Sequence, residues 1–170
     1  MKKVIIIGCP GSGKSTFARK LKEKTGLPLH HLDMLYWNED RTTVSREAFD
    51  DMLKNVIATN EWIIDGNYAR TMEARLKECD TVFFLDYKTD VCLEGIEARK
   101  GKIRSDMPWT EIDAPDEEFV AFVKSFEQES KPRIIELLKM YSSKNIIIFH
   151  DRCEADEYLS TLEKEEKYGV

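Results

Sequence analysis

Five short apolar runs alternate along this chain with longer segments in which hydrophobic residues recur at helical spacing. The apolar runs cover residues 3–7, 26–33, 61–65, 81–86 and 145–149. The first is a β-branched run of the kind found in strands that are buried on both faces. We therefore predict five strands, each separated from the next by at least one helix.

The helical pattern covers residues 15–25, 46–59, 71–78, 89–100, 117–141 and 154–165. Gly26 is placed to end the first helix, and Ser45 is the expected N-cap of the second. Within 117–141, Pro132 marks either a break between two helices or a fresh first turn. The pattern between the elements is polar, as expected for loops.

Strands that alternate with helices predict an α/β fold, in which a parallel sheet is covered by helices on both faces. Crossovers between such strands are right-handed, and ligands gather at the carboxyl ends of the strands. Gly8, Asp33, Asp65 and Asp86 all fall at those ends in the predicted arrangement. A functional site is expected at that edge of the sheet.

The stretch 8–15 reads Gly-Cys-Pro-Gly-Ser-Gly-Lys-Ser and fits the phosphate-loop pattern G-x-x-x-x-G-K-[ST] without a mismatch. Glycines let the backbone approach a phosphate, and the converging N–H groups bind the anion at the start of the helix. An accidental glycine-rich turn is the alternative, but a strand precedes the motif and a helix follows it. The residues expected to bind a nucleoside triphosphate are Gly8, Pro10, Gly11, Ser12, Gly13, Lys14, Ser15 and Thr16.

Phosphoryl transfer needs positioned phosphates, a metal and cations around the transferred group. Lys14 is long enough to reach the β- and γ-phosphates, and the Ser15 hydroxyl is expected on Mg²⁺. Asp65 ends an apolar strand, where a carboxylate holds Mg²⁺ directly or through water; capping of the following turn is the alternative. Asp33 has the chemistry of a base for a hydroxyl acceptor, or it caps the next segment.

Several arginines have a possible catalytic role. Arg70 lies near the start of a helix, where an acceptor phosphate would fit, although a solvated surface arginine explains it equally well. Arg99 and Arg104 belong to a basic stretch that is either a solvated turn or a mobile lid over the γ-phosphate.

Length and charge limit the remaining possibilities. The chain has 170 residues, which we interpret as one domain, 1–170. The net charge of −6 argues against direct nucleic-acid binding. No signal peptide or membrane span is apparent, and four scattered cysteines indicate neither a disulfide framework nor a zinc site, so we expect a cytoplasmic protein.

The phosphate loop together with residues 65–71 and 84–86 resembles the adenylate kinase-like nucleotide and small-molecule kinases. Residues 31–33, 62–68, 101–107 and 132–138 look more like bacterial DNA topology modulation proteins. The resemblance implies a P-loop NTPase fold with strand order 2-3-1-4-5, an acceptor-binding region at about 33–60 and a lid at about 100–116. It also implies ATP and Mg²⁺, with Lys14 and the lid arginines stabilising the transfer.

Two departures from the adenylate kinase pattern bear on the acceptor. Residues 65–70 are one residue longer than the corresponding segment, and Lys14-Ser15 matches shikimate and gluconate kinases instead. Together with Asp33, the second departure argues against an adenylate acceptor. The leading hypothesis is an ATP-dependent kinase acting on a small-molecule acceptor, either a nucleotide or a hydroxyl compound. The alternative is an ATP-binding regulatory protein that influences DNA topology without kinase turnover.

Overall fold

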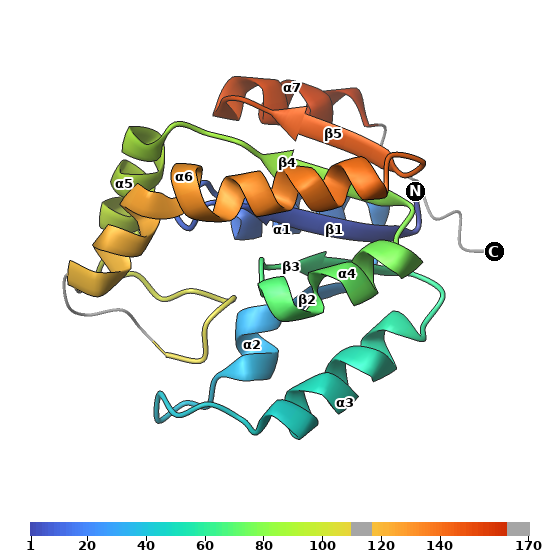
Figure 1. Ribbon diagram of the computed structural model, residues 1–170, viewed down its shortest axis with the longest axis horizontal. Coiled ribbons are helices and arrows are strands. Elements are labelled where there is room, and N and C mark those ends of the chain that lie inside the picture. Colours follow the sequence, from blue (N-terminus) through green and yellow to red (C-terminus); the bar gives the residue numbers. More distant parts are fainter. Residues whose placement is uncertain (110–116, 163–170) are drawn as a thin grey trace.

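The computed structural model describes residues 1–109 and 117–162, and it contains the five predicted strands (Figure 1). The strands are β1 Lys3–Gly8, β2 Leu29–His31, β3 Trp62–Asp65, β4 Thr81–Leu85 and β5 Asn145–Phe149. The helices are α1 Lys14–Thr25, α2 Leu32–Tyr36, α3 Arg46–Ile57, α4 Ala69–Glu78, α5 Thr89–Ala98, α6 Glu117–Met140 and α7 Arg152–Thr161.

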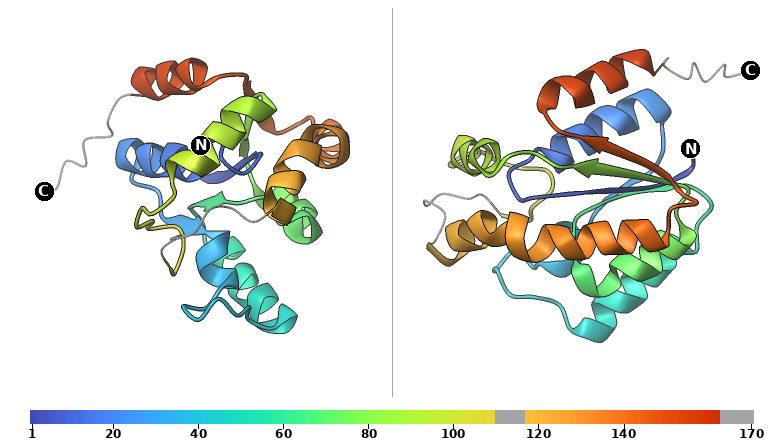
Figure 2. Two further views of the ribbon diagram at one scale, coloured as in Figure 1. Left: turned by 90° about the vertical axis from the view of Figure 1, so that its left-hand side faces the viewer. Right: turned by 45° about the horizontal axis from the view of Figure 1, so that its top comes forward.

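All strands pair in parallel, in the order β2-β3-β1-β4-β5, which confirms the predicted topology. Helices α1 and α7 lie on one face of the sheet, and α4 and α6 lie on the other (Figure 2). The short helix α2 and helix α3 lie beyond β2 at the edge (Figure 1). The carboxyl ends of β1, β3 and β4 therefore meet at one edge, as a three-layer α/β fold requires.

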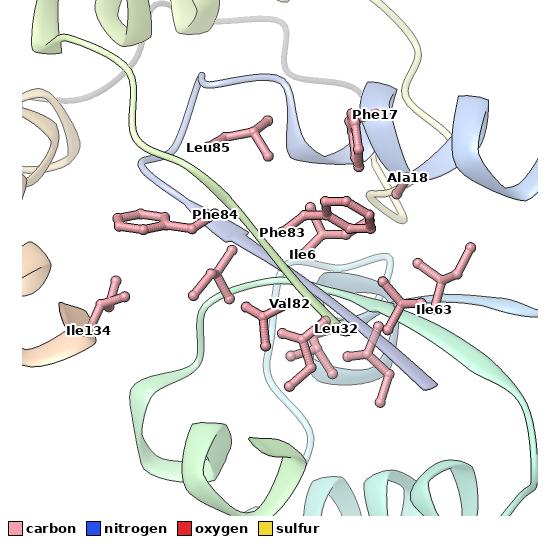
Figure 3. Close-up of a cluster of buried hydrophobic side chains, with 14 of the residues drawn as sticks. Ile6, Phe17, Ala18, Leu32, Ile63, Val82, Phe83, Phe84, Leu85 and Ile134 are labelled. Atoms are coloured by element: carbon pink, nitrogen blue, oxygen red, sulfur yellow. The ribbon is translucent and has the colours of Figure 1, made fainter. Parts of the chain in front are cut away.

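The core lies on both faces of the central strands. In β1, Val4, Ile5, Ile6 and Ile7 are completely buried, because strands and helices cover them from every side. Phe83 packs edge-on against Phe17 of α1, at 5.0 Å between ring centroids, on one face of the sheet. Its neighbour Phe84 points to the other face, toward Ile134 of α6 (Figure 3). This alternation fixes the sheet between its two helical layers.

The prediction that Asp33 ends a strand was wrong. Strand β2 pairs with β3 only as far as His31 opposite Asp65, where β3 itself ends. With no further partner strand, the chain turns at His31 into α2, and Asp33 lies in the first turn of that helix. Asp33 thus reaches the carboxyl edge of the sheet from a helix.

The segment around Pro132 forms one helix, α6, with the proline inside it. Proline removes one backbone hydrogen bond and costs a helix about 3 kcal/mol. Val123 and Phe126 before it and Ile134 and Leu138 after it are all buried, so packing on both sides offsets that cost. The predicted cap at Ser45 is confirmed, since its side chain accepts a hydrogen bond from the Ala48 N–H at 3.1 Å.

Two predicted segments extend beyond the described residues. The predicted lid, about 100–116, is described as far as residue 109, and the last predicted helix as far as residue 162. Within residues 1–109 and 117–162, no helix combines the length and the apolar composition that crossing a bilayer requires.

Candidate functional site

The phosphate loop, residues 8–15, joins β1 to α1 at the carboxyl edge of the sheet. Gly13 adopts a left-handed conformation with φ of 93°, and α1 begins at the next residue. Lys14 Nζ donates a hydrogen bond to the Cys9 carbonyl at 3.0 Å. Ser12 is buried, and its hydroxyl has no hydrogen-bond partner among the described residues. The loop thus keeps unused donor capacity beside a lysine, as an anion site needs.

Helix α5 packs against this loop through two glycines. A Cβ atom at Gly11 would lie 2.0 Å from the Cys92 carbonyl oxygen, and one at Gly95 would lie 2.0 Å from the Gly11 carbonyl oxygen. Both distances are far below van der Waals contact, so only glycine fits at either position. The loop backbone and the α5 backbone are therefore in direct contact.

The segment after β3 is attached to the loop by one side chain. The Asn67 side chain accepts a hydrogen bond from the Gly8 N–H at 3.0 Å and donates one to the Gly8 carbonyl at 2.8 Å. An amide is suited to this because it carries a donor and an acceptor side by side. Asn67 thereby holds residues 65–68 against the start of the phosphate loop.

Arg75 holds the same segment from the other side. Its side chain is fully buried and donates to the carbonyls of Gly66 at 2.8 Å, Tyr68 at 3.2 Å and Asn67. Burial lowers the pKa of Arg75 to about 10, so the guanidinium remains charged at neutral pH. The hydrogen bonds that Arg75 donates to these carbonyls also hold Tyr68 in a left-handed conformation, with φ of 38°.

Asp65 is 4% exposed and has one engaged oxygen and one unengaged oxygen. Its Oδ2 accepts the Ser15 hydroxyl at 2.7 Å and lies 2.8 Å from His31 Nδ1. Its Oδ1 is buried without a hydrogen-bond partner in the described part of the chain. A buried, unengaged carboxylate oxygen beside a serine hydroxyl suits a hard divalent cation, which takes oxygen ligands. Ser15 and Asp65 therefore have the chemistry of a Mg²⁺ site.

Asp33, in the first turn of α2, lines the same cavity as the phosphate loop. Its Oδ1 accepts a hydrogen bond from the Tyr68 hydroxyl at 2.7 Å. Burial raises the pKa of Asp33, while that hydrogen bond and the charge of Lys14 act in the opposite direction. An elevated carboxyl pKa is characteristic of groups that exchange protons with a substrate.

One cavity of about 1140 Å³ connects these groups. The lid segment, defined as residues 101–107, lines it with residues 102–107. The predicted site residues that line the cavity are Pro10, Gly11, Ser12, Gly13, Lys14, Ser15, Thr16, Asp33, Asp65, Arg99 and Arg104. Phe119 and Phe122 of α6 line it as well. The Arg99 guanidinium lies over the Phe119 ring, 5.5 Å from its centroid.

The structure does not bring every predicted residue to this cavity. Gly8 ends β1 and reaches the site through its hydrogen bonds to Asn67. Arg70 forms a two-pronged ion pair with Asp50 of α3, at 2.5 and 3.0 Å, and lines a separate small pocket. Asp86 pairs with Lys131 of α6 at 2.8 Å and is not among the residues that line the cavity.

Sequence reasoning assigned no role to several residues that shape the site. His31 contacts Asp65 through Nδ1. Asn67 and Asp106 belong to segments that resemble known proteins, but no role was predicted for either. No role was predicted for Arg75. For Arg75 a signal existed, because an arginine on the apolar face of a predicted helix is unusual.

The fold and the phosphate loop define a P-loop protein of the α/β class. In two solved structures, shikimate kinases share this fold over nearly the whole chain. That from Bacteroides thetaiotaomicron has a TM-score of 0.56 at 21% identity and covers 94% of both chains. That from Acinetobacter baumannii, in complex with shikimate, has a TM-score of 0.62 at 15% identity and covers 94% of this chain and 92% of the other.

Adenylate kinases are similar in sequence over part of the chain. Identity to that of Thermotoga neapolitana is 28% over 88 residues, covering 51% of this chain and 39% of that protein. Identity to that of Magnetococcus marinus is 36% over 104 residues, covering 59% and 47%. The chain thus spans less than half the length of these relatives. No family model matches the chain, and the resemblance to DNA topology modulation proteins stays a prediction. Both groups of similar proteins are kinases by name.

Proposed function

We propose that this protein is an ATP-dependent phosphotransferase that uses Mg²⁺ and phosphorylates a small molecule. The observation that carries the proposal is the cavity that the phosphate loop shares with Asp33, Asp65, Arg99 and Arg104. Triphosphate binding alone would not require Asp33 in the same cavity as Lys14. The kinases among the similar proteins support the same reaction class.

The phosphate side of the cavity would hold the ATP. Backbone amides of residues 8–15 and the Lys14 ammonium would bind the β- and γ-phosphates. Ser15 and the unengaged Oδ1 of Asp65 would hold Mg²⁺, which neutralises charge on the phosphate oxygens when bound. Arg99 and Arg104 would stabilise the charge on the transferring phosphoryl group.

The acceptor side favours a hydroxyl group over a phosphate. Asp33 would take the proton as an acceptor oxygen attacks the γ-phosphorus and the bond to ADP breaks. An acceptor that is itself a phosphate needs cations at this position, but Arg70 is paired with Asp50 outside the cavity. In this proposal, α2 and α3 form the acceptor-binding region, and the lid covers the reaction in a single domain.

A screen of ATP consumption tests the proposal. Purified protein is incubated with Mg·ATP and with hydroxyl compounds such as sugar acids, with nucleosides, or with nucleoside monophosphates. We expect acceptor-dependent ADP release with a hydroxyl compound. Selective turnover of nucleoside monophosphates would contradict the acceptor assignment. If calorimetry detects no binding of Mg·ATP at millimolar concentration, the phosphotransferase proposal itself fails.

A further inference from the structure

His31 contacts the carboxylate to which the proposed function assigns the cation. It is the last residue of β2, and in the register of the sheet it lies opposite Asp65, the last residue of β3. Its Nδ1 lies 2.8 Å from Asp65 Oδ2, and only 11% of the His31 side chain is exposed. The pairing of the two strands therefore brings the two side chains together in a place that is largely shielded from water.

The hydrogen bond runs from the imidazole to the carboxylate. A carboxylate oxygen only accepts hydrogen bonds, so the Nδ1 of His31 carries the proton and donates it. A histidine has such a donor even in its neutral form, so this contact needs no positive charge that would compete with a cation. His31 can thus fix the carboxylate without neutralising it.

A second donor binds the same oxygen from another element. The Ser15 hydroxyl, in the first turn of α1, donates to Asp65 Oδ2 at 2.7 Å. Its own oxygen keeps lone pairs for a cation while its proton stays on the carboxylate. Oδ2 is therefore held from β2 and from α1 at once, and both donors leave the other oxygen alone.

That other oxygen, Oδ1, is buried and has no hydrogen-bond partner in the described part of the chain. The last torsion of an aspartate side chain is broad and roughly two-fold, so a carboxylate that is not held can exchange its two oxygens. Two donors on Oδ2 oppose that exchange. They present Oδ1 of Asp65, a residue that lines the cavity, as the free acceptor.

The direction of this carboxylate matters because few acidic groups gather around it. Within residues 1–109 and 117–162, no three His, Cys, Asp or Glu side chains lie close enough together to bind a metal ion by themselves. Mg²⁺ is commonly held by one or two carboxylates together with the phosphates of the nucleotide. In the proposed function Asp65 is such a carboxylate, and the direction of its free oxygen decides how well the cation is held.

We propose that His31 is a positioning residue, which holds Oδ2 of Asp65 so that Oδ1 faces the cation of Mg·ATP. This inference rests on the proposed function. His31 touches neither the nucleotide nor the cation and acts only through Asp65. Side chains that orient a metal ligand in this way typically change the metal affinity by about 10- to 100-fold when they are replaced.

Calorimetry on the full chain tests this, with a non-hydrolysable ATP analogue titrated once with Mg²⁺ and once with EDTA. The ratio of the two affinities is the metal-dependent gain. We expect His31→Leu to reduce that gain by about tenfold or more, while the affinity in EDTA stays unchanged. His30→Leu is the matched control; His30 precedes His31 on β2 and projects to the opposite face of the sheet, so the gain should be kept.

Two further variants test the donor itself. In asparagine the amide nitrogen is bonded to Cγ, as Nδ1 is in histidine, so His31→Asn keeps a donor for Asp65 and should retain the gain. In glutamine the nitrogen lies one bond further out, so His31→Gln should lose the gain as His31→Leu does. A purely structural role of His31 would lower the melting temperature of these variants without separating them by their gain.

The remaining outcomes also decide. If His31→Leu weakens binding equally with Mg²⁺ and in EDTA, the gain is unchanged and the inference is overturned; an equal loss in His31→Asn or in His30→Leu overturns it too. If the melting temperature in EDTA shows that His31→Leu does not fold, His31→Asn is compared with His31→Gln. A larger gain in His31→Asn then supports the inference, and equal gains overturn it. A wild-type protein without any metal-dependent gain would instead contradict the proposed function.

Discussion

The phosphate loop and the lid segment both present cations to the same cavity, but they are held there by different means. The loop is held through its own backbone. It continues from β1, it touches the α5 backbone at Gly11, and the N–H and carbonyl of Gly8 both bond to the Asn67 side chain. The lid segment is held by side chains: Arg19 of α1 lies 3.7 Å from Asp106 and donates to the Ser105 hydroxyl at 3.3 Å, while Arg104 pairs with Asp106 inside the segment. Backbone packing fixes a group permanently, whereas an ion pair is exchanged when a stronger anion arrives. The loop is therefore suited to hold a ligand and the lid to respond to it.

The largest effect should come from the loop. Lys14→Ala removes the ammonium expected on the β- and γ-phosphates, and we expect turnover to fall by about 10³-fold while the fold stays intact. A coupled ADP-release assay with the best acceptor of the screen measures the loss, and circular dichroism checks the fold. Retained turnover would refute the assigned phosphate site.

Arg75 holds the segment that is attached to the phosphate loop, and it should contribute to the free energy of unfolding. Arg75→Met leaves three buried carbonyl groups without their charged donor, and we expect the free energy of unfolding to fall by about 3 kcal/mol or more. Urea denaturation measures this. Lys77→Met on the same helix α4 is the control; Lys77 is exposed, and its loss should change stability by less than about 0.5 kcal/mol. Equal effects of the two substitutions would show that Arg75 does not support residues 66–68.

The lid should affect rate more than binding. Arg104→Ala is expected to lower kcat by about 10²-fold with a much smaller change in ATP affinity, because its charge is used chiefly in the transition state. Steady-state kinetics and calorimetry separate the two quantities. Arg133→Ala, an exposed arginine of α6, serves as the control for lost positive charge. A loss of affinity equal to the loss of kcat would mean that the lid only binds ATP.

The smallest effect concerns Asp33. The charges of Lys14 in the phosphate loop and of Arg104 in the lid segment both act to lower its pKa. Asp33 accepts a proton only when ionised, so activity falls as the pH drops through its pKa, which burial raises. The Tyr68 hydrogen bond lowers that pKa, so Tyr68→Phe should shift the acidic limb of kcat/KM to higher pH. A pH–rate profile of both proteins shows the shift; an unchanged limb would exclude Asp33 as the titrating base.

The parts of the molecule that depend on local sequence signals could be predicted, and those that depend on long-range contacts could not. Apolar runs and glycine spacing are local signals, and they predicted the parallel sheet and the elements on either side of Lys14. The strand order was implied only by the resemblance to known kinases. The position of Asp33 on α2 was missed because the end of β2 is set by where its neighbour β3 ends. Arg70 could not be placed from sequence, since its partner Asp50 lies on another helix. Long-range pairing of charged side chains has no periodic signature in a sequence.

Asn67 has one more consequence for the architecture. Strand β3 stops pairing with β1 at Asp65 opposite Ile6, two residues before β1 ends. By binding the N–H and the carbonyl of Gly8, the Asn67 side chain supplies the next rung of the ladder in place of a backbone. The main chain can then leave the sheet after Asp65 and bring Tyr68 to Asp33, to which its hydroxyl donates a hydrogen bond. A single amide side chain thus lets one strand be short without fraying its longer neighbour.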